Sequence, residues 1–381
     1  MSSIDDLIAE LAPEGVESKT LGEVLRIKNG KDHKSLGDGD IPVYGSGGIM
    51  RYVDAAAAEG PSVLIPRKGS LGNIFYVEGP FWVVDTIFRT EIDTSQVEPK
   101  FVYHQLLTMK LGEMNQAGGV PSQTQTVLNS LRIPVPPLEV QREIVRVLDQ
   151  FTQLEAELEA ELEARRRQYE HYRTELLADA AALGRLVELG ELGRIVTGRT
   201  PKSSDSSAWG DHLDFVTPSD IKNGMKRIHS PARQLSISGA EALSKAIVPE
   251  GSLLVTCIGA DMGKTVLNAN ACATNQQINS LTPNSGIATD FVFHVLTSMR
   301  DEIRAQGERA GGTMPIINKS DFSKIRIALP PLEEQQRVAR ILDQFDALVN
   351  DLSVGLPAEL TARRKQYEYY RDKLLSFREA D

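Results

Sequence analysis

An internal duplication constrains this chain more than any other feature of its sequence. Residues 133–151 (IPVPPLEVQREIVRVLDQF) return as residues 327–345 (IALPPLEEQQRVARILDQF), an offset of 194 positions. Residues 164–177 (ARRRQYEHYRTELL) return as residues 362–375 (ARRKQYEYYRDKLL), at an offset of 198 positions. Because self-similarity is the signature of a repeated architecture, the 381-residue chain is predicted to contain two related halves.

The two copies differ by four residues that lie between the repeated segments. The first copy reads LEAE, LEAE, LEAR from Leu154, whereas the second reads LVND, LSVG, LPAE, LTAR from Leu348. The insertion therefore corresponds to one additional tetrapeptide. A shorter repeat precedes each copy, because LGEVLRIKNG at residues 21–30 resembles LGELGRIVTG at residues 189–198. Each half is thus a variable region followed by a nearly constant segment.

The constant segments are predicted to be long helices. Proline pairs at 136–137 and 330–331 end the preceding strand and can preset a first helical turn. Apolar residues then recur three and four positions apart, which is the helical period. A single stripe of this length needs a partner, so the two helices are expected to pair, antiparallel, about a pseudo-twofold axis. The stripes are Leu148, Phe151, Leu154, Leu158, Leu162, Tyr169 and Leu176, and Leu342, Phe345, Leu348, Leu352, Leu356, Leu360, Tyr367 and Leu374.

Two further features of the helices bear on their role. Gly355 and Pro357 lie inside the second helix, where an interior proline removes a hydrogen bond, so a kink is expected. A coiled-coil hairpin that serves only as a spacer or dimer handle would explain the repeated leucines. It would not explain repeated exposed arginines, which indicate two equivalent surfaces for two copies of one partner. These partner-docking candidates are Arg165, Arg166, Arg363 and Arg364.

The order of these segments resembles that of the specificity subunit of type I restriction–modification systems. The resemblance covers nearly the whole chain and includes the PPLExQ and LDQF motifs and the tetrapeptide repeats. It implies an α+β fold in which two α/β target-recognition domains are separated by two long antiparallel, coiled-coil-like helices, with an internal pseudo-twofold duplication. The expected domains are residues 1–134 (first target-recognition domain), 135–182 (first helical spacer), 183–328 (second target-recognition domain) and 329–381 (second helical spacer).

The resemblance also implies a function without catalysis. Each target-recognition domain would read one half of a bipartite site in double-stranded DNA. The helices would set the spacer between the half-sites and dock two methyltransferase subunits, which methylate adenine, together with motor-nuclease subunits. S-adenosylmethionine would then belong to the methyltransferase partner, ATP and Mg²⁺ to the motor-nuclease partner, and no cofactor to this chain. A helix of roughly 40 residues is about 60 Å long, which suits half-sites somewhat more than one DNA turn apart.

A net charge of −10 is unusual for a DNA-binding protein. The first helix accounts for part of it, since residues 137–178 hold ten acidic and six basic residues. The variable regions are close to neutral, with twelve of each at residues 19–132 and fourteen acidic against fifteen basic at residues 186–326. Such a chain would bind DNA weakly without help, which points to basic partners.

Other sequence features favour a cytoplasmic protein without membrane contact. The chain has no run of eighteen apolar residues, and its first residues, MSSIDDLIAE, are acidic. Cys257 and Cys272 lie in apolar, strand-like stretches without metal-ligand spacing, so they are expected to be ordinary buried thiols.

Catalytic motifs are missing from the sequence. The proline pairs lack the Asn/Asp-Pro-Pro-aromatic setting that resembles an amino-methyltransferase site, which disfavours a fused restriction-methyltransferase. GADMGKT at residues 259–265 is one residue short of a phosphate-binding loop, and the six histidines are scattered. A DNA reader remains the leading hypothesis. The alternative is a coiled-coil interaction scaffold with two protein-binding heads and no DNA role.

Candidate DNA-binding residues lie in glycine-containing loops with polar or basic side chains, because glycine permits close approach to DNA. The first region offers YGSGGIMR (44–51), PRKGSLG (66–72) and QAGGVPSQTQ (116–125). The second offers TGRTPK (197–202), the turn at Lys264, ATNQQI (273–278) and GERAGGTMPIINK (307–319). The candidates are Ser46, Arg51, Arg67, Lys68, Ser122, Gln123, Gln125, Arg199, Lys202, Lys264, Gln276, Gln277, Arg309, Thr313 and Lys319.

Two of these loops are favoured by position rather than by composition. Residues 116–125 precede the first constant helix just as residues 307–319 precede the second. Within ATNQQI, strand alternation would turn every second side chain inward, so either Gln276 or Gln277, but not both, is expected to face DNA.

Overall fold

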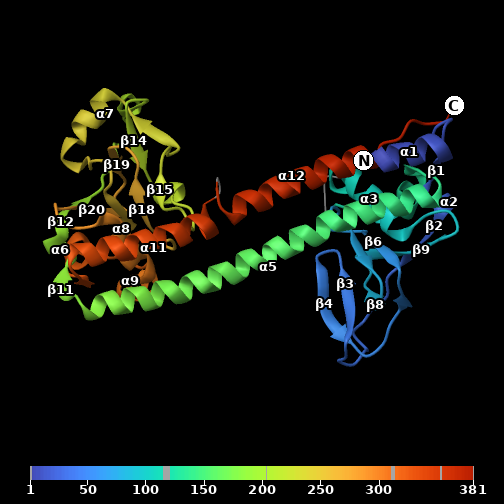
Figure 1. Cartoon of the computed structure of the whole chain (residues 1–381), viewed down its shortest axis with the longest axis horizontal. Helices are drawn as coiled ribbons and strands as arrows, with labels where there is room; N and C mark the ends of the chain where they lie inside the picture. Colours follow the sequence, from blue (N-terminus) through green and yellow to red (C-terminus); the bar gives the residue numbers. More distant parts are fainter. Residues whose placement is uncertain (1, 115–120, 203, 310–313, 352–353, 381) are drawn as a thin grey trace. The chain divides into compact units, whose positions relative to one another are not determined.

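A computed structural model of the chain describes residues 2–114, 121–202, 204–309, 314–351 and 354–380 (Figure 1). The chain forms two compact units. Unit 1 comprises residues 1–157 and 362–381, and unit 2 comprises residues 158–361. Each unit therefore contains one variable region together with segments of both constant repeats. The described residues include no helix that is long and apolar enough to cross a membrane.

Unit 1 contains two four-stranded sheets and a short ribbon. The first sheet is antiparallel, with the order β2 (Leu25–Asn29), β9 (Ile87–Ile92), β6 (Ser62–Pro66) and β7 (Phe75–Val77). The second has the order β4 (Gly48–Val53), β3 (Ile41–Gly45), β8 (Pro80–Val83) and β5 (Ala58–Glu59). The ribbon pairs β1 (Ser18–Thr20) with β10 (Arg132–Pro134). The helices of the globular part are α1 (Ser2–Leu11), α2 (Leu21–Val24), α3 (Pro99–Thr108), η1 (Leu111–Met114) and α4 (Gln125–Ser130).

Unit 2 repeats this plan. Its main sheet has the order β12 (Gly193–Thr197), β20 (Ile278–Pro283), β17 (Leu253–Thr256), β18 (Thr265–Asn268) and β15 (Arg227–Ile228). The second sheet has the order β13 (Trp209–Gly210), β16 (Arg233–Leu235), β14 (Leu213–Val216) and β19 (Cys272–Thr274), and the ribbon pairs β11 (Arg185–Glu188) with β21 (Arg326–Leu329). Its helices are α6 (Leu189–Leu192), η2 (Ser206–Ala208), η3 (Pro218–Asp220), α7 (Ile237–Ala242), η4 (Ser244–Ala246), α8 (Thr289–Ser298), α9 (Arg300–Glu308) and α10 (Lys319–Ser323).

The two variable regions share this plan although their sequences have diverged. The antiparallel order β2, β9, β6 recurs as β12, β20, β17, and the parallel pair β3 and β8 recurs as β14 and β19. The predicted duplication is therefore confirmed at the level of fold. Most positions need only a buried apolar side chain, which many residues can supply, so divergence preserves the plan.

The LGE motif that opens each variable region has the same role in both units. Leu21 and Leu189 are completely buried. Glu23 accepts a hydrogen bond from the N–H of Thr20, and Glu191 accepts one from the N–H of Glu188, which caps α2 and α6. The leucine of the repeated motif is thus a buried core residue, and its glutamate caps the helix that begins at this leucine.

The constant segments form helices, but the second is interrupted. The first is a single helix, α5 (Leu138–Ala182), whereas the second divides into α11 (Leu332–Asn350) and α12 (Leu356–Leu374). The expected kink is therefore a break. A Cβ atom at Gly355 would lie 2.4 Å from the carbonyl oxygen of Ala347, so only glycine fits at this position without a clash. Pro357 falls in the first turn of α12, where a missing N–H costs nothing.

Aromatic residues of one repeat pack against those of the other. In unit 1, the ring of Phe151 on α5 stacks on Tyr370 of α12, with centroids 5.5 Å apart. In unit 2, Phe345 on α11 contacts Tyr172 on α5, with centroids 5.7 Å apart. Both phenylalanines belong to the LDQF motif, and both tyrosines to the repeated QYExY segment. Each unit therefore combines the LDQF motif of one repeat with the tyrosines of the other.

The helix segments run antiparallel within unit 1. Moving along α5 from Phe151 to Glu155, the partner on α12 moves back from Tyr370 to Arg364, whose Nε lies 2.6 Å from Glu155 Oε1. This agrees with the antiparallel pairing that a pseudo-twofold relation between the two halves requires.

A buried glutamine joins each constant helix to its variable region. Gln141, the glutamine of PPLEVQ, accepts a hydrogen bond from Glu98 N–H at 2.8 Å and donates to the carbonyl of Pro136 at 2.7 Å. Gln335 accepts one from Ala288 N–H at 2.9 Å and donates to the carbonyl of Pro330 at 2.8 Å. Glu98 and Ala288 are the N-cap residues of α3 and α8. The side chain thus satisfies backbone groups that would otherwise be buried without partners.

The aspartate of LDQF pairs with a lysine in both units, and in unit 2 it also hydrogen-bonds a histidine. Asp149 lies 2.8 Å from Lys100 Nζ and 3.9 Å from Nε2 of His104 on α3. Asp343 lies 2.6 Å from Lys226 Nζ and 2.7 Å from Nε2 of His294 on α8. His104 and His294 are 3% and 0% exposed, so both are packing residues of the frame.

Replacement of Gln335 by methionine should destabilise unit 2 by about 3 kcal/mol, because the partly buried Ala288 N–H and the buried Pro330 carbonyl would lose their partner. Urea unfolding followed by the fluorescence of Trp209, in a Trp82→Phe background, measures this change. The exposed neighbour Gln336 provides the control. If Gln336→Met shifts the midpoint as much as Gln335→Met does, the bridging role is wrong.

Unit 1 should lose stability as the pH falls from about 6.5 to about 4. Burial lowers the pKa of His104 from 6.5 to about 4, although Asp149 opposes the shift. Below pH 6.5 the unfolded chain therefore binds a proton that the folded unit excludes, which removes roughly 3 kcal/mol by pH 4. Fluorescence of Trp82 in a Trp209→Phe background reports this unfolding. His104→Gln should flatten the pH dependence, whereas exposed His171→Gln should leave it unchanged. An equally steep profile in His104→Gln would contradict the assignment.

Candidate nucleic-acid interface

Three loops of unit 1 meet at one end of its main sheet. Lys68, after β6, pairs through a backbone bridge with Ser122, before α4. The same loops are joined by hydrogen bonds from Gly69 N–H to the Pro121 carbonyl, 3.0 Å, and from Gln123 N–H to the Arg67 carbonyl, 2.9 Å. We call this arrangement of residues 66–69 with 121–123 the loop junction of unit 1. The turn after β3 adjoins it, because Asn73 donates a hydrogen bond to the Ser46 carbonyl at 3.1 Å.

Unit 2 builds the same junction with different side chains. Ile258 and Ile316 form the backbone bridge. Gly259 N–H donates to the Pro315 carbonyl at 3.1 Å, and Ile317 N–H donates to the Cys257 carbonyl at 2.9 Å. The loop junction of unit 2 is therefore residues 257–259 with 315–317. Lys68 and Ser122 correspond to two isoleucines, so the backbone frame is constant while the presented chemistry differs.

A further turn completes each junction, and the sequence singled out only the one in unit 2, within ATNQQI. In unit 1, Arg67 N–H donates to the carbonyl of Thr86 at 2.9 Å, just before β9. In unit 2, Cys257 N–H donates to the carbonyl of Gln277 at 2.7 Å, just before β20. Thr86 was missed because its VDT context carries no glycine or basic residue.

The interpretation of ATNQQI as a strand is wrong at its centre. β19 ends at Thr274 and β20 begins at Ile278, so the two glutamines occupy a turn. Gln276 is exposed, and its Oε1 accepts a hydrogen bond from Thr200 Oγ1 at 2.7 Å. Gln277 is half-buried, and its Oε1 accepts one from Asn275 Nδ2 at 2.9 Å. Gln276 is the more accessible of the two, for turn geometry rather than strand alternation.

Glycine at the end of the LGE-containing repeat lets the chain cross beside this turn. A Cβ atom at Gly30 would lie 2.0 Å from the carbonyl oxygen of Val84, and one at Gly198 would lie 2.1 Å from that of Asn275. The next residue then hydrogen-bonds across the sheet in both units, from Lys31 N–H to the Val83 carbonyl and from Arg199 N–H to the Thr274 carbonyl, both at 2.8 Å.

Several candidate residues are engaged in the fold. Arg51 donates to the Leu36 carbonyl and pairs with Asp38 at 3.2 Å, which fixes its guanidinium on a neighbouring loop. Gln123 is 9% exposed and donates to the Leu111 carbonyl. Lys264 is largely buried, with Nζ 2.7 Å from Asp261 Oδ1. These contacts give the three side chains structural partners within the free chain.

Other candidates stand at the surface. Arg67 is half-buried, with its guanidinium near the Phe88 ring, and Gln125 donates to Asn29 Oδ1 at 3.2 Å. Thr313 lies outside the described residues. The exposed candidates are Lys68, Ser122, Arg199, Lys202, Gln276, Arg309 and Lys319, whereas Ser46 is half-buried.

The repeated arginines of the helices are exposed and make pairs along or between helices. Arg165 pairs with Glu161 at 3.3 Å in the same helix, and Arg364 pairs with Glu155. Arg363 Nη1 lies 3.5 Å from Gln366 Oε1, while Arg166 lines a cavity of unit 2. Exposed pairs of this kind contribute about 0–1 kcal/mol, so stability alone does not account for the repetition.

The described residues contain no group of three His, Cys, Asp or Glu side chains placed to hold a metal ion. The two cysteines are buried, as the sequence predicts. Burial raises the pKa of the Cys257 thiol to about 11 and that of Cys272 to about 12, so both remain protonated near neutral pH.

The chain has known relatives in sequence. Residues 13–164 and 185–362 match the family model of the type I restriction modification DNA specificity domain. A Haemophilus influenzae protein named as a type I restriction enzyme specificity subunit is 30% identical over 95% of this chain and 96% of its own length. The Escherichia coli EcoR124I/EcoR124II specificity subunit is 32% identical over 76% of this chain and 73% of its own length.

Solved structures show the same fold at low sequence identity. The S subunit of a type I restriction-modification system from M. genitalium matches with a TM-score of 0.62 and 14% identity, covering 94% of this chain and 96% of that one. A chain from a structure on complex assembly and conformational transition of the type I R-M system matches with a TM-score of 0.60 and 20% identity, covering 95% and 97%.

Substitution of Gly30 by alanine should displace the turn at residues 84–86 and destabilise unit 1 by at least about 2 kcal/mol, because the new Cβ would collide with the Val84 carbonyl. Urea unfolding followed by Trp82 fluorescence measures the effect. Gly79→Ala is the matched control in the same unit, since a Cβ there would meet nothing within 4 Å. Equal stability of Gly30→Ala and Gly79→Ala would refute the close-approach argument.

Proposed function

The chain belongs to the family of type I restriction–modification DNA specificity subunits, the non-catalytic DNA-recognition subunits of these systems, and we propose how its two units divide that task. Unit 1 reads one half of a split site in double-stranded DNA, and unit 2 reads the other half. Base contacts come from side chains at the two loop junctions and their adjoining turns, while nearby cations contact phosphates.

The observation that carries this proposal is the recurrence of one loop junction with different side chains. The backbone hydrogen bonds match pair for pair between the units. Lys68 and Ser122 of unit 1 correspond to Ile258 and Ile316 of unit 2, and Gln276 is presented beside the second junction. A constant frame with variable side chains is what a reader of two different half-sites needs, so the expected target is asymmetric.

The tetrapeptides support a second element of the proposal, that the helices set the spacer between half-sites. Unit 1 ends at Glu157 and resumes at Ala362, so both crossings between the units fall within the tetrapeptide segments. Adding or removing a tetrapeptide changes the helix that connects the two readers by about 6 Å, which is between one and two base pairs.

The repeated exposed surface of the helices supports the third element, which concerns partners. Arg165 and Arg166 recur as Arg363 and Arg364, each pair beside the same QYExY segment. Two copies of a methyltransferase subunit would dock on these equivalent surfaces and methylate adenine with S-adenosylmethionine that they bind themselves. Motor-nuclease subunits would join the same complex and carry ATP and Mg²⁺.

Mapping of methylated adenines in cells with and without the gene tests the reading function. The expected result is one split, asymmetric motif that appears only with the gene. Deletion of residues 158–161 (LEAE) should shorten its unread spacer by one or two base pairs. The length-preserving variant Leu158→Ala is the control and should keep the original spacing. An unchanged spacer after the deletion would contradict the proposal that the helices set the spacer length. Identical methylation with and without the gene would favour the protein-binding scaffold.

A further inference from the structure

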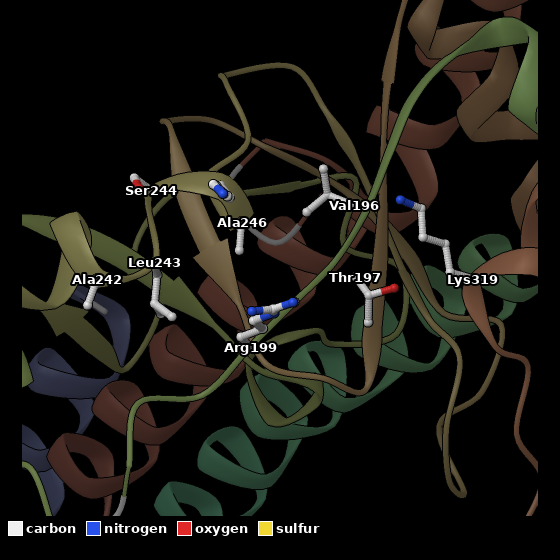
Figure 2. Close-up of a pocket in the computed structure, with 10 residues that line it drawn as sticks. Val196, Thr197, Arg199, Ala242, Leu243, Ser244, Ala246 and Lys319 are labelled. Carbon is white, nitrogen blue, oxygen red and sulfur yellow. The ribbon is translucent and has the colours of Figure 1, made fainter.

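A cavity of about 690 Å³ lies in unit 2, beside the end of β12. Three separate segments line it: residues 196–199 at the end of β12, residues 242–246 from α7 to η4, and Lys319 at the start of α10. Figure 2 shows Arg199 and Lys319 on either side of Thr197, with Leu243, Ser244 and Ala246 along the cavity. The guanidinium of Arg194 donates to the Ile247 carbonyl at 2.8 Å, which holds the η4 segment close to β12.

The lining of this cavity is cationic. It includes Arg199, Lys245 and Lys319, all exposed, and no acidic residue. No ion pair of these three cations is found among the described residues, in contrast to Lys264, whose ammonium is bound by Asp261. Ser244 adds a hydroxyl group, whereas the Thr197 hydroxyl donates to Asn279 Oδ1 at 2.6 Å. Three cations that line one cavity without a carboxylate create a positive potential that favours an anion, and a phosphate group accepts hydrogen bonds from both arginine and lysine.

The cavity borders the loop junction of unit 2. Arg199 is followed by Thr200, whose hydroxyl donates to Gln276 Oε1 at 2.7 Å in the turn that completes the junction. Lys319 lies two residues after Ile317, whose N–H donates a hydrogen bond to the Cys257 carbonyl within the junction. An anion held in this cavity would therefore lie next to the side chains that are exposed for base contact.

We propose that this cavity is a phosphate-binding pocket that takes a backbone phosphate of the DNA beside the half-site read by unit 2. The proposal rests on the reading function above and assigns to it a positioning contact. Lys245 is its new member, because its context, ALSKAI, gave no signal of DNA binding in the sequence. A backbone phosphate is the favoured source of the anion because the pocket adjoins the junction, although inorganic phosphate or a free nucleotide carries the same group.

The test compares the full-length chain with the double variant Lys245→Gln/Lys319→Gln, each with its methyltransferase partner. Fluorescence anisotropy measures binding to a labelled duplex that carries the methylated motif, and to a scrambled duplex, between 50 and 200 mM salt. Each lost phosphate contact should lower the salt slope by about 0.9, so the affinity ratio between these salt concentrations should shrink about 3.5-fold per contact. Both duplexes should be affected alike, because phosphate contacts carry no sequence information.

Two variants control for charge and folding. Lys324→Gln removes one exposed lysine from the end of the same helix, outside the cavity, and should retain the wild-type slope. Lys245→Arg keeps the charge and should retain most of the affinity. Calorimetry with inorganic phosphate, on wild type and double variant, distinguishes the two sources of the anion.

A lower slope in the double variant alone supports the pocket with DNA as its ligand. Loss of inorganic phosphate binding without any change in DNA binding would overturn DNA as the source. A wild-type salt slope together with unchanged phosphate binding in the double variant would overturn the pocket. The reading function would still stand if the chain prefers the motif duplex. If wild type shows no preference for the motif duplex, the reading function fails, and the phosphate calorimetry then decides the pocket separately.

Discussion

The packing of Phe151 on Tyr370, and of Phe345 on Tyr172, is the interaction on which the rest of this structure depends. Each contact joins the LDQF motif of one repeat to the tyrosines of the other. Unit 1 therefore cannot form from residues 1–157 alone, because it needs α12, which follows the second variable region. Unit 2, residues 158–361, needs the part of α5 that precedes its own variable region. The apolar stripe of a lone helix would otherwise remain exposed to water.

The polar residues of the same motifs make these helices part of the variable regions rather than a separate stalk. Gln141 and Gln335 complete the N-termini of α3 and α8. Asp149 and Asp343 each pair with a lysine, and Asp343 also hydrogen-bonds the buried His294 of α8. A buried amide has few acceptable replacements, since substitution leaves unpaired groups behind. This explains why these letters recur in both copies while the regions around them diverge.

The loop junctions have the same backbone frame in both units. Their backbone bonds recur in both units, so the positions of the presented side chains are set by the sheet and by glycine at Gly30 and Gly198. The side chains themselves are free to change without loss of the frame. In the proposed reading function, the presented side chain can therefore change, from Lys68 in one unit to Ile258 in the other, without any change of fold.

The sequence by itself determined the duplication, the helical constant segments, the tetrapeptide difference and the family, because these depend on periodicity and on repeated residues. It also predicted which loops contact DNA, from the glycine and basic residues that cluster there. Only the tertiary structure decided that Gly355 and Pro357 break the second helix, that Gln276 and Gln277 form a turn, and that Lys264 and Arg51 are bound by carboxylates. It alone brought Lys245 beside Arg199 and Lys319. Such outcomes depend on contacts between residues far apart in the chain, which no local pattern encodes.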